Sequence, residues 1–188
     1  MKVLVGVSQR HAHLTKDDIK VLFGDNYELK KIKELYQPGQ YACQECVTIK
    51  GPKDEITNVR VLGPERNKTQ IEISKGDTYR LGIDAPIRDS GDLDDAAEVT
   101  IIGPNGTLTK NAAIIATRHI HLSTAEASNL GLTNKSTIII IVGGEKPGIL
   151  NNVHVRVDNN FKMQIHLDVD DANAFLINNG DEVEVITQ

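Results

Sequence analysis

The feature that most restricts the fold of this chain is an internal repeat built around Arg-His-x-His-Leu. Residues 10–24, RHAHLTKDDIKVLFG, align with residues 118–131, RHIHLSTAEASNLG. Each copy continues into a hydroxyl residue that can cap a helix, an acidic first turn and a short helix. A long β-rich segment separates the copies, so a duplication is expected to produce two related domains. Exchange of strands between such domains would bring the two copies to one central site.

Short strands dominate the rest of the chain. Segments rich in Val, Ile and Thr predict strands at 3–7, 46–50, 56–62, 69–74, 98–102, 114–117, 137–142, 153–158, 162–167 and 182–186. Turn dipeptides such as Gly51-Pro52 and Asn179-Gly180 separate many of them. Helices are predicted to open at Thr15, at Ser123 and near Asp170, whereas residues 28–35 suit either a helix or a charged loop. Brief strands with such turns favour small barrels or sandwiches over a parallel α/β sheet.

These patterns predict a mainly β protein of two fused small β-barrels with short capping helices. The first barrel domain is expected to comprise residues 1–9 and 117–188. The second is expected to comprise residues 10–116, with a loop at 25–44. An origin by internal duplication would explain why both domains carry the same motif.

The two His-x-His motifs predict metal binding. They contain His11 with His13 and His119 with His121, four of the six histidines in the chain. Residues two apart in a strand point to the same face, about 6.7 Å apart, so their imidazoles can converge on one ion. Histidines that cap turns or face solvent are the alternative, and it would be favoured for a single motif. Two copies in the same sequence context favour metal ligation.

A catalytic zinc ion commonly has three protein ligands and one open position, so each motif needs a further donor. His166, on a predicted strand before an acidic run, is the better third ligand for one ion. His154 competes with it but is expected to be a surface strand residue. Glu72 could serve the other ion, although its local pattern favours a polar strand face. The acidic residues within 168–171 are explained more simply as helix-capping groups.

Composition excludes several classes of function. The chain has 188 residues, a formal charge of −5 and 4% aromatic residues, which argues against nucleic acid as the main partner. The longest strongly apolar run, 138–142, is too short to span a membrane. The N-terminus of the chain resembles a strand rather than a signal peptide, so a cytoplasmic protein is expected. Cys43 and Cys46 form one C-x-x-C pair, interpreted as ordinary reduced thiols.

Several longer segments resemble the PduL-type phosphate acyltransferases, a family that includes phosphate propanoyltransferase. The resemblance covers nearly the whole chain and is carried by SQRHAHL, PGQYACQECVTIKGPK, VRVLGPERNKTQIEIS, APIRDSGDL, AIIATRHIHL and IHLDVDDANA. It implies two fused β-barrels with a dinuclear metal centre, for which zinc is expected. Residues 25–35 and 143–152 match no strong family motif, which leaves the preference between acetyl and propanoyl groups open.

The resemblance also implies a role for individual residues. One ion would take His11, His13 and Glu72, against the local interpretation of Glu72. The second would take His119, His121 and His166. Arg66, in the Gly-Pro-x-Arg stretch, would bind phosphate and act in catalysis. Contacts with coenzyme A (CoA) would fall on Ser8, Gln9, Arg10, Lys53, Arg60 and Asn173.

The expected reaction interconverts a short-chain acyl-CoA plus phosphate with an acyl phosphate plus CoA. Direct displacement by phosphate is favoured, with Cys43 or Cys46 as an acyl carrier the alternative. A dinuclear-zinc hydrolase of the thioesterase kind and a non-catalytic metal-binding barrel are competing functions. The first predicted strand begins close to Met1, without the extra amphipathic segment of relatives in microcompartments, so a free cytosolic enzyme is expected. A homodimer is also expected, with no nucleic-acid or membrane partner.

Overall fold

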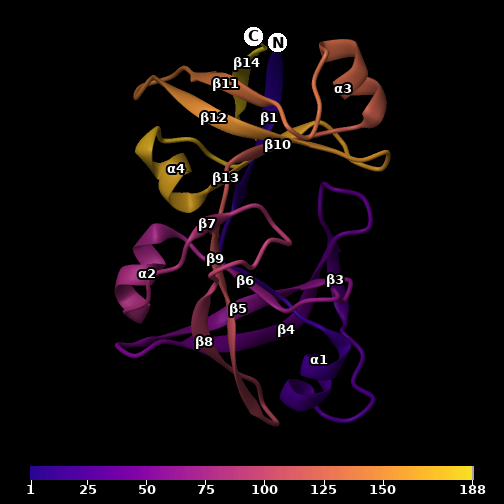
Figure 1. Ribbon diagram of the computed structural model, residues 1–188, viewed down its shortest axis with the longest axis vertical. Coiled ribbons are helices and arrows are strands. Elements are labelled where there is room, and N and C mark those ends of the chain that lie inside the picture. Colours follow the sequence, from indigo (N-terminus) through magenta and orange to yellow (C-terminus); the bar gives the residue numbers. More distant parts are fainter. Residues whose placement is uncertain (188) are drawn as a thin grey trace. The chain divides into compact units, whose positions relative to one another are not determined.

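The computed structural model describes residues 1–187, which form two compact units (Figure 1). One unit comprises Gln9–Ala116 and is called the central barrel. The other combines Met1–Ser8 with the residues from Thr117 onward and is called the split barrel. Its name reflects that its strands come from both ends of the chain.

The split barrel is a closed ring of strands in the order β1-β13-β10-β12-β11-β14. Their bounds are β1 (Lys2–Ser8), β10 (His119–Leu122), β11 (Thr137–Val142), β12 (Gly148–Val157), β13 (Gln164–Asp168) and β14 (Glu182–Ile186). β1 pairs in parallel with β13 and antiparallel with β14. The N-terminal strand therefore closes a barrel that is otherwise made by the C-terminal half of the chain.

The central barrel closes in the order β4-β5-β2-β6-β9-β8, because β8 pairs with both β4 and β9. Its strands are β2 (His11–His13), β3 (Lys31–Glu34), β4 (Tyr41–Lys50), β5 (Glu55–Gly63), β6 (Gln70–Glu72), β7 (Ile87–Arg88), β8 (Ala97–Ile102) and β9 (Thr107–Ala116). β3 extends the wall at β4 and β7 extends it at β9.

The two barrels share one pairing scheme. β2 and β10, the His-x-His strands, each pair in parallel with one neighbour, β5 or β12. Each pairs antiparallel with the other neighbour, β6 or β13. β6 and β13 in turn pair in parallel with β9 and β1. The predicted mainly β fold of two small barrels is confirmed, and the common scheme agrees with an internal duplication.

Aliphatic side chains fill the interior of each barrel. On β11, Ile138, Ile140 and Val142 are buried in the core of the split barrel, as the alternation of side chains along a strand requires. Ile120 lies in the same core, and Ala12 lies in the core of the central barrel. Because each of these two residues separates the histidines of a His-x-His motif, the histidines point away from the barrel interior.

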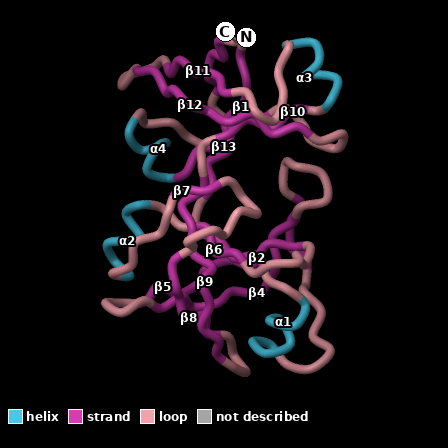
Figure 2. Tube along the Cα trace, in the orientation of Figure 1, coloured by secondary structure: helices cyan, strands magenta, loops and turns pink. Residues whose placement is uncertain are grey.

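Within the described residues, four short helices follow strands of the barrels (Figure 2). They are α1 (Lys16–Phe23), α2 (Lys75–Leu81), α3 (Thr124–Leu130) and α4 (Val169–Ala174). Each begins at an oxygen-bearing N-cap that accepts a backbone N–H, namely Thr15, Ser74, Ser123 and Asp168. No helix within residues 1–187 has the length and hydropathy needed to cross a bilayer.

The differences from the predicted elements have identifiable causes. α2 was not predicted, since Gly76 interrupts the helical pattern although Ser74 and Asp77 form a capping box. Residues 28–35 form neither a helix nor a plain loop: they contain β3, because β4 supplies the pairing partner. For β4, β9 and β12 the sequence predicted only the C-terminal part of a ten-residue strand.

Candidate functional site

His11, His13 and Glu72 form a buried cluster on the outer face of the central barrel. β2 and β6 are paired antiparallel, and His11 lies directly opposite Glu72. One potential ligand atom from each residue lies within 4.8 Å of those from the other two. The imidazole Nε2 of His11 is 3.5 Å from Oε2 of Glu72. The strand register, which brings Glu72 to the histidines, is a tertiary feature that its local sequence pattern did not indicate.

Hydrogen bonds orient this cluster for ligation. Nδ1 of His11 lies 2.8 Å from the carbonyl oxygen of Gln9, so it donates a proton there and leaves Nε2 available. Nδ1 of His13 is buried and has no hydrogen-bond partner among residues 1–187. A buried ring nitrogen without a partner is costly unless a ligand or ion satisfies it. Nε2 of His11 and Nδ1 of His13 are therefore the ring nitrogens that could bind a ligand.

The charges around the cluster affect the two histidines differently. Burial lowers the pKa of His13 well below its usual range, and the nearby His11 and Arg66 lower it further. Burial also lowers the pKa of His11, but the carboxylate of Glu72 and hydrogen bonds outweigh it and raise that pKa overall. His13 is thus held as the neutral imidazole, which is the form that binds a metal ion.

His119, His121 and His166 form the corresponding cluster of the split barrel. β10 and β13 are antiparallel, and His119 lies directly opposite His166. The three potential ligand atoms again lie within 4.8 Å of one another. Nδ1 of His119 is 2.8 Å from the carbonyl oxygen of Thr117, which repeats the contact between His11 and Gln9. His154 lies opposite His119 on β12, outside this three-residue cluster.

The strand register makes the two clusters equivalent position by position. Glu72 and His166 both face the first histidine of a motif, and Gln70 and Gln164 both face the second. Nε2 of Gln70 donates to Oε1 of Glu72 at 2.6 Å, and Oε1 of Gln164 is 2.8 Å from Nε2 of His166. Neither glutamine was predicted from the sequence to belong to a site. Their signal is the repeated Gln-Ile that precedes the third residue of each cluster.

Both donor sets suit a divalent transition metal. Imidazole nitrogen with carboxylate oxygen, or three imidazoles, are ligand sets used by zinc, and three protein ligands leave a coordination position open. The acidic residues after His166 have a structural role instead. Oδ1 of Asp168 accepts the backbone N–H groups of Asp170 and Asp171 at the start of α4, each at 2.8 Å.

Arg66 lies near the central-barrel cluster, since its positive charge lowers the pKa of both His11 and His13. Its Nη1 donates to Oγ of Ser90 at 3.1 Å. Nε2 of Gln70 donates to the same oxygen at 2.8 Å. Arg66 is therefore linked through two side chains to Glu72, a member of the cluster.

The residues expected to contact CoA fall in both units. Gln9 supplies the carbonyl that orients His11, and Arg10 forms an ion pair with Asp77. The Nζ group of Lys53 lies 3.4 Å from the carbonyl oxygen of Tyr79. Arg60 lies opposite His11 on β5 and donates to the carbonyl oxygens of residues 43 and 44.

Ser8 and Asn173 belong to the split barrel. Ser8 ends β1 and faces Asp168, the N-cap of α4, and Asn173 is exposed on that helix. Arg156, which the sequence analysis did not single out, lies opposite His121 on β12. It adds a positive charge to the strand beside the split-barrel cluster.

The two cysteines are free thiols. Cys43 is fully buried, and burial together with the nearby Glu45 carboxylate raises its pKa to about 11. A neutral, buried thiol is a poor nucleophile. Cys43 therefore lacks the environment of an acyl carrier.

The sequence of the chain is similar to those of known proteins. The family model described as phosphate propanoyltransferase matches residues 4–178. A phosphate propanoyltransferase of Thermotoga maritima is 50% identical over 98% of this chain and 89% of its own. Those of Rhodopseudomonas palustris and Rhodobacter capsulatus are 46% and 47% identical over 98% and 97% of this chain, and 82% and 86% of their own. The chain therefore belongs to the phosphate propanoyltransferase family and is an acyltransferase.

Proposed function

We propose that this chain transfers a short acyl group between CoA and inorganic phosphate with the help of two divalent metal ions, zinc being the expected metal. The observation that carries the proposal is the pair of equivalent three-residue clusters in a member of this family. The relatives are named phosphate propanoyltransferases, which gives phosphate and a propanoyl group as their reactants. Acetyl-CoA is proposed as a second substrate, because residues 25–35 and 143–152 match no strong family motif and so leave the choice of acyl group open.

Each barrel would hold one ion. His11, His13 and Glu72 would bind the first, and the second would be bound by His119, His121 and His166. Such ions, when bound, polarise a thioester carbonyl, orient phosphate and accept a soft thiolate sulfur. The carbonyl groups of Gln9 and Thr117 would keep the first histidine of each set oriented.

The chain's own residues would supply the rest of the chemistry. The guanidinium of Arg66 would hold phosphate through two parallel hydrogen bonds, a geometry that a lysine ammonium cannot reproduce. Its contact with Ser90 would fix the direction of the fork before phosphate arrives. Lys53, Arg60, Ser8, Gln9 and Asn173 remain the proposed CoA contacts. Arg10, which the resemblance adds to them, forms an ion pair with Asp77.

Direct displacement accounts for the reaction without a covalent enzyme intermediate. A phosphate oxygen forms a bond to the thioester carbonyl carbon, the carbon–sulfur bond breaks, and CoA leaves as its thiolate. Cys43, the more deeply buried thiol, is held neutral by its raised pKa of about 11 and would not compete with phosphate. Holding phosphate and thioester next to each other would supply much of the rate enhancement.

The decisive experiment measures free CoA thiol released from propanoyl-CoA and acetyl-CoA, with and without phosphate. Native protein is compared with metal-stripped protein and with stripped protein to which zinc or cobalt is returned. Phosphate-dependent release that disappears on stripping and returns with metal supports the proposal. Release without phosphate would instead identify a thioesterase-like hydrolase. Metal binding without any release would identify a non-catalytic metal-binding protein.

A further inference from the structure

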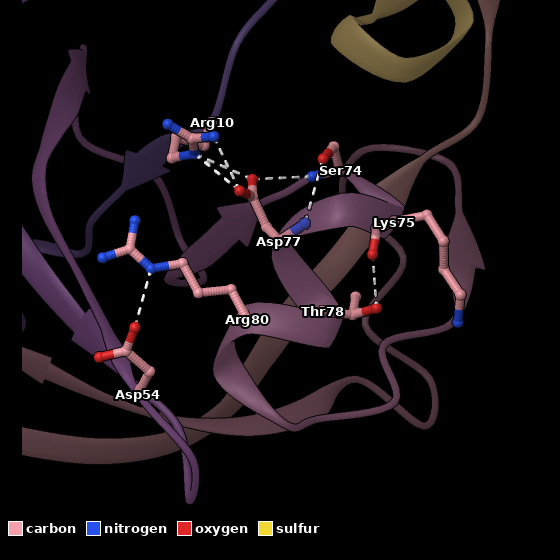
Figure 3. Close-up of polar contacts among 7 residues, drawn as sticks. All are labelled: Arg10, Asp54, Ser74, Lys75, Asp77, Thr78 and Arg80. Atoms are coloured by element: carbon pink, nitrogen blue, oxygen red, sulfur yellow. Dashed lines mark hydrogen bonds and ion pairs between the residues drawn. The ribbon is translucent and has the colours of Figure 1, made fainter.

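An ion pair next to the central-barrel cluster has no role in the function proposed so far. Arg10 immediately precedes His11, and its guanidinium contacts the carboxylate of Asp77 (Figure 3). Nε lies 3.0 Å from Oδ1 and 2.9 Å from Oδ2, and Nη2 lies 2.8 Å from Oδ1. The side chain of Asp77 is only 6% exposed and that of Arg10 is 42% exposed, so the carboxylate is shielded from water while the arginine side chain remains partly accessible. Forked, charge-assisted contacts of this kind define direction as well as distance.

Asp77 also connects the ion pair to the strand that carries Glu72. It is the N3 residue of α2, where Oδ2 accepts the backbone N–H of Ser74 at 3.2 Å. Ser74 returns the contact by accepting the N–H of Asp77 with its hydroxyl, which completes the capping box. Ser74 lies two residues after Glu72. One carboxylate therefore joins the residue before His11 to the segment just beyond Glu72.

The contacts of Asp77 lie at one end of the short β2–β6 pairing. β2 and β6 have three residues each, and His11 at the start of β2 faces Glu72 at the end of β6. The pairing of β2 with β6 ends at this pair, although β5 also pairs with β2 at His11 and β9 with β6 at Glu72. Arg10 also lies between His11 and Gln9, whose carbonyl oxygen accepts from Nδ1 of His11. Its anchoring fixes the backbone that supplies both the ring and its hydrogen-bond acceptor.

The split barrel contains a corresponding ion pair. Arg118 immediately precedes His119, and its Nη2 lies 3.0 Å from Oδ1 of Asp171. Asp171 again lies three residues after the N-cap of the helix that follows the third ligand strand. The sequences of the helices themselves differ, GDTYRL against DDANA after the first position, yet the arginine and the N3 acid recur. A contact retained in both copies of the duplication argues for a role at the cluster.

We propose that Arg10 and Arg118 are positioning residues that hold the metal-binding clusters in shape through their ion pairs with Asp77 and Asp171. This inference rests on the proposed metal-dependent function and changes the expected role of Arg10. The resemblance to the family predicts that Arg10 contacts CoA, whereas in the structure its guanidinium forms an ion pair with Asp77. Lysine at this position would keep the charge but lose the fork that contacts both carboxylate oxygens.

The test measures zinc affinity at one site at a time. In a His119→Ala/His121→Ala background, the zinc dissociation constant of the central barrel is determined by competition with a chromophoric chelator. Arg10→Lys and Asp77→Asn are expected to weaken zinc binding by about tenfold to a hundredfold, the usual effect of losing an orienting partner of a ligand. The visible spectrum of the cobalt-substituted protein should change in the same variants, since it reports ligand geometry.

The matched control is a second ion pair on the same helix. Arg80 and Asp54 are joined at 3.0 Å and are both about half exposed (Figure 3). Arg80→Lys removes an arginine–aspartate contact from α2 without touching β2 and should leave zinc affinity and the cobalt spectrum unchanged. Arg118→Lys, in a His11→Ala/His13→Ala background, should weaken binding at the split barrel.

Three results would overturn the inference, each in a recognisable way. Unchanged zinc affinity, together with a raised KM for acyl-CoA when Arg10→Lys is made in the protein that keeps both clusters, would make Arg10 a CoA contact. Unchanged zinc affinity with a lower urea midpoint of the metal-free protein would make the ion pair purely structural. If the background proteins bind no zinc, the proposed metal dependence fails first, and that result is visible before any arginine variant is compared.

Discussion

At the scale of single residues, Arg66 lies at one end of a side-chain network that reaches the central-barrel cluster. Its guanidinium donates to Ser90, Gln70 donates to the same hydroxyl, and Gln70 also donates to Glu72. Arg66 is therefore joined to Glu72 by three hydrogen bonds in series, and its positive charge also lowers the pKa of His11 and His13. Because lysine keeps that charge, a change to lysine is expected to affect phosphate binding more than the cluster.

Arg66→Lys is expected to raise the KM for phosphate by about tenfold or more, because one of two charge-assisted hydrogen bonds is lost. The KM for propanoyl-CoA should change little. Both constants are obtained from initial rates of CoA thiol release, with zinc content checked in parallel. An unchanged KM for phosphate would remove Arg66 from the phosphate site.

The buried thiol of Cys43 gives a prediction with a defined pH dependence. Its pKa is raised to about 11, so the thiolate becomes appreciable only as the pH approaches that value. At pH 8 only about one thiol in a thousand is ionised, and alkylation by iodoacetamide should be slower than for a free cysteine by a factor of about a hundred or more. Peptide mass spectrometry after timed alkylation measures the rate, and the urea-unfolded protein is the control.

The same chemistry predicts that Cys43→Ser retains phosphate-dependent turnover. The hydroxyl cannot carry an acyl group as a thioester, but direct displacement does not require one. Loss of turnover with an intact zinc content would contradict direct displacement and favour an acyl-carrier role for this residue.

At the scale of secondary-structure elements, the short helices depend on their first turns. α2 has seven residues, too few to be stable by itself, and its capping box satisfies N–H groups at both Ser74 and Asp77. Ser74 and Asp77 are both buried, so the N–H of Asp77 would not be solvated by water if the Ser74 hydroxyl were removed.

Ser74→Ala should lower the free energy of unfolding by about 1 kcal/mol. Urea unfolding of the metal-free protein, followed by circular dichroism, measures the change. Ser123→Ala at the equivalent capping box of α3 is the comparison, because that box is only partly buried. A loss at Ser123 as large as that at Ser74 would show that burial of the box adds nothing.

At the scale of the whole molecule, the split barrel depends on a strand distant in sequence. β1 pairs with β13 and β14, and Val5 is fully buried in the barrel core. Removing residues 1–8 leaves those two strands without their shared neighbour and opens the ring.

Deletion of residues 1–8 is therefore expected to abolish slow hydrogen exchange in β13 and β14 while preserving it in β4 and β5 of the central barrel. Exchange followed by peptide mass spectrometry resolves the two sets of strands. Retained protection in β13 and β14 would show that the remaining strands close without β1.

Sequence patterns predicted much of this organisation because their causes are local. The repeat at 10–24 and 118–131 indicated a duplication, and alternating Val and Ile residues indicated short strands. The N-caps at Thr15 and Ser123 indicated helices, as the structure confirms. His11, His13, His119 and His121 were candidate ligands from spacing alone, since residues two apart on a strand share a face.

The tertiary structure decided the features that depend on pairing between distant strands. Local pattern favoured a polar strand face for Glu72, and only the register of β2 with β6 brings it opposite His11. Strand register also places Gln70 opposite His13 and Gln164 opposite His121, at equivalent positions of the two barrels. Pairing with β4 made β3 a strand where the sequence allowed a helix or a loop. Local patterns determine which residues can form a strand or share its face. The neighbour of that strand is chosen by contacts between residues far apart in the chain, and those contacts exist only once the barrels close.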